Sequence, residues 1–155
     1  MAEDLRRYLI TQGQERYRAC IIHAPAMGHK TELARRIRDV LGAYLLDLQA
    51  YFLEHPDLAA KIDRFGPDDL ESLLLRLQVA PRLVVVDNLD FLLNTWSRAR
   101  LEQFVAMVDV RLVSPDVTDK TFVFFVQTRP EIASRQLTNT RGQPRILPLD
   151  AFQPL

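Results

Sequence analysis

A phosphate-binding pattern is the first candidate for chemistry in this chain. It spans Ala24, Pro25, Ala26, Met27, Gly28, His29, Lys30 and Thr31. The reference pattern is G-x-x-x-x-G-K-[ST], in which backbone amides and the lysine hold phosphate oxygens while the hydroxyl reaches a magnesium ion. Lys30 and Thr31 fit this pattern, but Ala24 and His29 replace its two glycines and Gly28 comes one position early. Because glycine lets the backbone curl around phosphate without a Cβ in the way, these replacements predict a shifted loop or a weaker grip.

An acid at the end of an apolar run supports the same chemistry. The run Leu83-Val-Val-Val-Asp87 is apolar and β-branched up to its last residue, as expected of a central strand. An acid in that position is suited to hold a magnesium ion and its waters. We therefore expect Lys30 to bind the β and γ phosphates of a nucleotide, and Thr31 and Asp87 to bind Mg²⁺. The alternative is that Gly28-His29 forms only a turn and that Asp87 caps the following segment.

Alternating strands and helices are predicted to position these residues. Buried strands are expected at 18–23, 43–48, 83–87, 121–127 and 145–149, the last restricted by Pro148 to an edge or a strand end. Helices are expected over 3–12, from Lys30 to Gly42, from Pro67 to before Pro81, along 101–108 and over 130–137. Such alternation predicts a three-layer α/β fold, in which a five-stranded, mostly parallel sheet carries helices on both faces. Ligands bind at the carboxyl edge of such a sheet.

Length and composition indicate a single globular domain. The 155 residues are 48% hydrophobic and 26% charged, which predicts one domain over 1–155 with its core at about 17–149. The formal net charge is zero, so no overall field attracts nucleic acid or an anionic membrane. The single cysteine, Cys20, suits a reducing compartment. Trp96 is expected in the core rather than in an interface. No apolar run approaches the length of a membrane span. We expect a cytoplasmic protein without a membrane partner.

Arginines outnumber acids near the C-terminus. Between 129 and 145 the chain contains Arg129, Arg135, Arg141 and Arg145 but only one acid, Glu131. This region could contact the backbone of DNA, although a solvated loop is the favoured interpretation. The histidines lack the spacing of a metal site, so no metal is expected beyond nucleotide-bound magnesium.

Three segments resemble the core of AAA+-like ATPases, the additional-strand branch of the P-loop family. Residues 24–31 are similar to a phosphate loop with a degenerate Walker A motif, 84–90 to the magnesium-site strand and 122–128 to the sensor strand. The resemblance covers 18–149, and the small helical lid of that family is missing. A stand-alone core of this size is also similar to the BrxF family of small P-loop proteins, which belong to the BREX systems of antiviral phage defence.

The resemblance implies an ATP-binding, Mg²⁺-dependent ATPase or nucleotide switch that acts as a homo-oligomer or with partner proteins in a larger, DNA-directed assembly. Asn88 follows Asp87, where the family often has glutamate. Because an amide orients water but cannot take its proton, weak or partner-dependent hydrolysis is predicted unless Asp90 turns inward. Gln127 is expected to sense the γ-phosphate or to hold the attacking water. The alternative is that Gln127 is only the ordinary end of a strand. Arg111 is expected to reach a neighbour's nucleotide, although a solvated surface arginine fits as well.

Two other functions are compatible with these residues. The altered glycines also fit a degenerate P-loop fold that serves as a protein-interaction module without nucleotide turnover. A nucleoside or small-molecule kinase is disfavoured, because the sequence shows no arginine-rich lid and no acceptor pocket.

Overall fold

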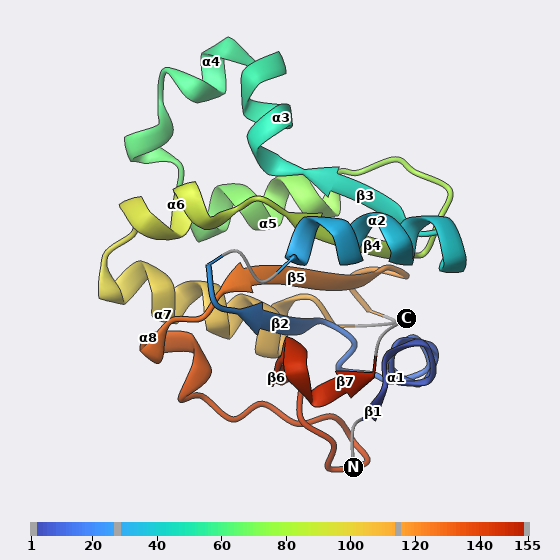
Figure 1. Cartoon of the computed structure of the whole chain (residues 1–155). Helices are drawn as coiled ribbons and strands as arrows, with labels where there is room; N and C mark the ends of the chain where they lie inside the picture. The colour runs from blue at the N-terminus through green and yellow to red at the C-terminus, as the bar shows by residue number, and fades with distance from the viewer. Residues whose placement is uncertain (1–2, 27–28, 114–115, 154–155) are drawn as a thin grey trace.

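A five-stranded parallel sheet forms the centre of the computed structural model, which describes residues 3–26, 29–113 and 116–153 (Figure 1). Its strands are β2 (Cys20–Ala24), β3 (Tyr44–Asp47), β4 (Leu83–Asp87), β5 (Thr121–Gln127) and β6 (Ile146–Pro148). They lie in the order β3-β4-β5-β2-β6, and each neighbouring pair is parallel. The predicted α/β class is confirmed, and Pro148 lies in the edge strand β6 as predicted.

Helices cover both faces of this sheet. They are α1 (Leu5–Gln12), α2 (Lys30–Leu41), α3 (Leu48–Glu54), α4 (Pro56–Ala59), α5 (Pro67–Leu75), α6 (Asp90–Thr95), α7 (Arg98–Ala106) and α8 (Pro130–Ala133). Shorter helical turns are η1 (Ile62–Arg64), the π-helical turn η2 (Met107–Arg111) and η3 (Leu149–Ala151). One core cluster joins α1 and α2 to Ile22 and Val85, and the other joins α5, α6 and α7 to Ile21 and Val84. The clusters lie on opposite faces because successive side chains of a strand point in opposite directions.

Helix α2 has the limits that the sequence predicts. It begins at Lys30, directly after His29, and its C-cap residue Gly42 has φ +69°. Glycine adopts this left-handed conformation without a Cβ penalty, which explains why the helix ends there. Ala34 and Ile37 are fully buried against the sheet, so the amphipathic pattern fixes which side of α2 faces solvent.

Several elements differ from the prediction. Helix α6 was not expected, because six residues are too few to show an apolar stripe. Helix α8 ends at Ala133 instead of Leu137, since the carbonyl of Leu137 accepts the backbone N–H of Arg145 at 2.7 Å in an extended pairing. A second, two-stranded parallel sheet joins β1 (Glu3–Asp4) to β7 (Phe152–Gln153).

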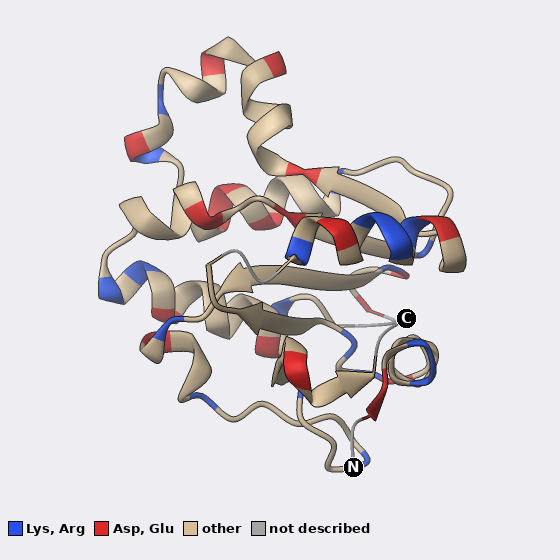
Figure 2. Cartoon of the chain, in the orientation of Figure 1, with Lys and Arg blue, Asp and Glu red and all other residues tan. Residues whose placement is uncertain are grey.

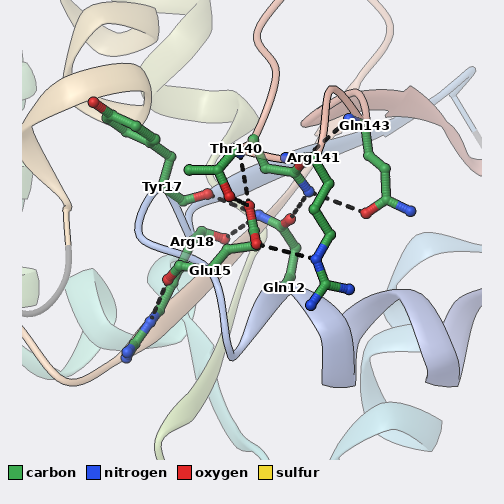
Figure 3. Close-up of polar contacts among 8 residues, drawn as sticks. Gln12, Glu15, Tyr17, Arg18, Thr140, Arg141 and Gln143 are labelled. Atoms are coloured by element: carbon green, nitrogen blue, oxygen red, sulfur yellow. Dashed lines mark hydrogen bonds and ion pairs between the residues drawn. The ribbon is translucent and has the colours of Figure 1, made fainter.

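A polar network ties the loop before β6 to the N-terminal segment (Figure 3). Glu15 Oε1 accepts the backbone N–H and the hydroxyl of Thr140, each at 2.7 Å, and Glu15 Oε2 lies 3.5 Å from Arg141 Nε. Gln12 Oε1 accepts a hydrogen bond from Asn139 Nδ2 at 2.8 Å. Gln12, Glu15 and Asn139 are all buried, so this network fixes the loop in one conformation.

Trp96, which was expected in the core, and the single cysteine are both buried. Trp96 is 5% exposed, and its indole Nε1 donates to the carbonyl of Phe65 at 2.7 Å. Cys20 is fully buried as a free thiol, and burial raises its pKa to about 12.

Charged residues of both signs are interspersed along α2 and α7 (Figure 2), in line with the net charge of zero. None of the helices in the described part of the chain has the length and hydropathy that a bilayer crossing requires.

Candidate functional site

The predicted phosphate and magnesium residues meet at the carboxyl edge of the sheet. Lys30 and Thr31 form the first turn of α2, which follows the end of β2. Asp87 is the last residue of β4. Because all strands run in the same direction, these positions share one edge, and the positive end of the α2 dipole faces it (Figure 1).

Asp87 is the buried centre of this edge, only 1% exposed. Burial raises the pKa of its carboxyl group, while hydrogen bonding with the Thr31 side chain and the Asn88 backbone, together with the charge of Lys30, lowers it. Thr31 and Lys30 are therefore close enough to Asp87 to affect its pKa. Among the described residues, no hydrogen-bond partner reaches Asp87 Oδ1. A buried carboxylate oxygen without a partner costs free energy, and a bound cation would satisfy it.

His29 has the backbone conformation of a glycine. Its φ of 60° and ψ of 30° lie in the left-handed region, which histidine enters more readily than most residues. Its imidazole is largely exposed, and Nδ1 lies 3.7 Å from Glu32 Oε2. A Cβ at this position is thus compatible with the start of α2. Met27 and Gly28, two further residues of the predicted phosphate loop, lie outside the described residues.

Asn88 also has a positive φ, of 56°. Asparagine is one of the few residues with a Cβ that enters this region routinely. The sharp turn after β4 is therefore a backbone reason for asparagine in place of glutamate, separate from any role in holding water. Asn88 is half-buried at the same edge as Asp87.

Gln127 ends β5 beside the start of the predicted phosphate loop. It is in register with Ala24 of β2, its side chain is exposed, and its backbone N–H donates to Asp90 Oδ1 at 2.8 Å. Asp90 thus faces the end of β5, and this hydrogen bond fixes its orientation. The Gln127 side chain is accessible to a ligand lying on the edge.

Arg111 is not brought to this edge. It ends η2, which precedes the start of β5, whereas the predicted phosphate-binding residues follow the end of a strand. Its guanidinium forms a bidentate ion pair with Glu71 of α5, with Nη2 2.9 Å from Oε2. A role at a neighbour's nucleotide would require this intrachain pair to open.

Asp47 also lies at this edge, although the sequence did not single it out as a candidate. It ends β3 and is the register partner of Asp87 on β4. Its charge raises the pKa of Asp87 further, after the larger effect of burial. The predicted strand at 43–48 contained this acid but ended one residue later, at Leu48, so the register that places Asp47 beside Asp87 is known only from the structure.

A cavity of about 530 Å³ adjoins the predicted phosphate loop on the side of β6, away from Asp87. It is lined by His23, Ala24, Pro25, Thr128, Pro148, Leu149 and Asp150. His23 Nδ1 lies 2.9 Å from Thr128 Oγ1. Burial lowers the pKa of His23, and the charge of Asp150 partly offsets this. Apolar walls with a few convergent polar groups are typical of small-molecule pockets.

The edge therefore combines a helix N-terminus, two strand-end acids and an adjoining cavity. No family model, curated protein or solved structure matches this chain. Over the described ranges, no group of three or more His, Cys, Asp or Glu residues is placed so that it could hold a metal ion. A magnesium ion at Asp87 would depend on phosphate oxygens and water, which is how Mg²⁺ is commonly bound in nucleotide sites.

The arginines between 129 and 145 do not form a free basic surface. Arg145 is 1% exposed and donates to the carbonyls of Thr138, Ala19, Val108 and Asp109. Arg141 pairs with Glu15, and Arg129 bonds to Asn94. Only Arg135 of the four is exposed without an ion pair or side-chain hydrogen bond among the described residues. The contribution of Arg145 to a DNA-binding surface is excluded by its burial.

Proposed function

We propose that this chain is a P-loop protein of the additional-strand type that binds ATP with Mg²⁺ and hydrolyses it weakly or only with a partner. The observation that carries the proposal is Asp87, a buried carboxylate with one unpartnered oxygen beside Thr31 and Lys30. A purely structural acid would be expected to find partners for both oxygens.

The strand order supports this assignment. β5 lies between β2, which leads into the phosphate loop, and β4, which ends in Asp87. The additional-strand branch is named for such an inserted strand. Gln127 at the end of β5 then lies between the two halves of the candidate site, as expected for a residue that senses the γ-phosphate or holds the attacking water.

The same order suggests a direction for the nucleotide. Asp87 lies two strands from β2 on one side, so the terminal phosphate would lie toward β4. The nucleoside would then extend to the other side of the loop, where the cavity between β2 and β6 has a suitable size. Proline and leucine walls would contact the base, and His23, Thr128 and Asp150 would offer polar contacts.

Each residue has a distinct role in this proposal. Lys30 would neutralise the β and γ phosphates, and the free backbone N–H groups at the start of α2 would bind their oxygens. Thr31 and Asp87 would hold Mg²⁺, which would stabilise negative charge on the transferred phosphoryl group. Asn88 or Gln127 would orient water without accepting its proton, which is consistent with weak hydrolysis.

Action in a larger assembly, as a homo-oligomer or with partner proteins, is supported by the resemblance to AAA+-like ATPases. The resemblance to the BrxF family supports a role in BREX-type phage defence. Co-purification with the products of neighbouring genes, with and without ATP, would test both.

Thermal denaturation with ATP and Mg²⁺ tests the central proposal. A ligand at 100 times its dissociation constant that binds only the folded state stabilises it by about 2.7 kcal/mol. We expect a clear rise in Tm for the native chain and none for Lys30→Ala. Lys61→Ala, at an exposed residue of the loop before η1, is the matched control and should respond like the native chain.

A second candidate function is a protein-interaction module without nucleotide turnover. The replacement of both pattern glycines, by Ala24 and His29, favours it. Equal melting temperatures with and without ATP and Mg²⁺ would support this module and contradict the ATP-binding proposal.

A further inference from the structure

Two carboxylates lie side by side where β3 and β4 end. Asp47 and Asp87 are register partners in a parallel pair. Neighbouring strands lie about 4.8 Å apart, and register partners in a sheet project their side chains to the same face. The two acids therefore lie on one face of the carboxyl edge, next to the first turn of α2.

The carboxylates of Asp47 and Asp87 lie close together although their negative charges repel each other. The negative charge of Asp47 adds to the effect of burial in disfavouring ionised Asp87, as expected for adjacent carboxylates. Asp87 is 1% exposed and its Oδ1 has no hydrogen-bond partner among the residues that the structure describes. A divalent cation would convert the repulsion into attraction and satisfy this buried oxygen.

Asp47 also caps a helix, and this contact fixes the orientation of its side chain. Its Oδ1 accepts the backbone N–H of Ala50 at 3.1 Å and thereby caps α3. A carboxylate has two oxygens and can accept several hydrogen bonds, so the cap leaves acceptor capacity for a metal-bound water. The cap also restricts the side chain to one rotamer, which favours such a positioning role.

The other acid near Asp87 is oriented differently. Asp90 Oδ1 accepts the backbone N–H of Gln127, on the side of β5 rather than β3. The residue directly after Asp87 is the amide Asn88. Asp47 is thus the acid that the register brings beside Asp87.

We propose that Asp47 joins Thr31 and Asp87 in the protein's binding site for the divalent cation of the bound nucleotide, as a positioning residue that holds a metal-bound water. This inference rests on the proposed nucleotide-binding function. Asp47 lies outside the phosphate-loop pattern and outside the strand that ends in Asp87.

Substitution can separate the charge of Asp47 from its capping role. Asparagine caps helices about as well as aspartate, whereas alanine does not. Asp47→Asn should therefore retain the Tm of the native chain, and Asp47→Ala should lower it. Asp57→Asn, at an exposed acid of α4, is the matched control for loss of one negative charge.

Manganese binding in the presence of a non-hydrolysable ATP analogue is the decisive measurement. By electron paramagnetic resonance, we expect Asp47→Asn to weaken Mn²⁺ binding about tenfold, the lower limit for loss of an outer-shell partner. Binding of the metal-free analogue should be unchanged or slightly tighter, because a negative charge near the phosphates is removed. Asp57→Asn should match the native chain in both assays.

The outcomes distinguish this inference from the function on which it rests. If the native chain binds the analogue and Asp47→Asn binds Mn²⁺ as tightly as the native chain does, Asp47 is only a helix cap and the inference is wrong. If the native chain binds the analogue neither with nor without Mn²⁺, the proposed nucleotide site itself is wrong.

Discussion

Asp90 joins the start of α6 to the end of β5, because its Oδ1 accepts the backbone N–H of Gln127 at 2.8 Å. The two residues are 37 positions apart, and their contact closes the edge between β4 and β5. The Gln127 N–H would otherwise be left to solvent at the point where a nucleotide would lie.

Replacement of Asp90 tests how much this contact contributes. We expect Asp90→Ala to lower the free energy of unfolding by about 1 kcal/mol, a usual value for one hydrogen bond. Asp90→Asn, which retains an acceptor oxygen, should lose less. Urea denaturation measures both, and an unchanged stability in Asp90→Ala would mean that water replaces the carboxylate at no cost.

The strands that the sequence predicts best are those buried on both faces. The runs 83–87 and 121–127 are found with the predicted limits, because an uninterrupted apolar run has no polar residue that could shift its ends. The start of α2 and its end at Gly42 could be predicted equally well, since a loop, an amphipathic helical pattern and a glycine follow one another in the sequence.

The residues that the sequence did not reveal depend on contacts between distant segments. Asp47 becomes a site candidate only through its register with Asp87, and Asp90 finds its partner on a strand far along the chain. Local periodicity contains no information on register between such strands. Arg145 shows the same limit, because its burial depends on backbone carbonyls from several segments.

Asp87 should limit the stability of the free protein. Its pKa is raised chiefly by burial, so the ionised carboxylate is less stable in the folded chain than in the unfolded chain at neutral pH. We expect Asp87→Asn to raise the Tm in the absence of ligand by roughly 2–4 °C, which corresponds to about 1 kcal/mol for a chain of this size.

The same substitution should remove the response to magnesium. The Tm of Asp87→Asn with ATP should be equal with and without Mg²⁺, whereas the native chain should gain stability from the metal. Asp57→Asn serves as the exposed control. A lower Tm for ligand-free Asp87→Asn would show that the carboxylate stabilises the fold rather than being retained for binding.

His23 should make stability depend on pH. Burial lowers its pKa from the ordinary value of 6.5, so the unfolded chain binds a proton that the folded chain excludes. The free energy of unfolding should therefore fall as pH drops through 6.5 and level off below the folded pKa. The contribution of neutral His23 is fully present above pH 6.5.

His23→Gln isolates this effect, because glutamine can still bond Thr128 but does not titrate. Urea denaturation between about pH 7.5 and pH 5.5 should show a smaller loss of stability for His23→Gln than for the native chain. His55→Gln, at an exposed histidine, should behave like the native chain. Parallel curves for His23→Gln and the native chain would contradict the assigned pKa direction.

His29 allows the departure from the phosphate-loop pattern to be tested directly. At φ 60° its Cβ carries a steric penalty, of about 1–2 kcal/mol for most residues in this region. His29→Gly relieves this penalty but gives the unfolded chain more freedom, at a cost of about 0.4–1 kcal/mol. The two effects nearly cancel, so the Tm should change little or rise slightly.

Nucleotide binding by His29→Gly should become several-fold tighter, because phosphate can then approach the backbone without a side chain beside it. His29→Ala keeps the Cβ without the imidazole, and we expect no gain in affinity and a lower Tm. Calorimetric titration with ATP and Mg²⁺ compares the three chains. If His29→Gly binds more weakly than the native chain, the imidazole itself contacts the ligand.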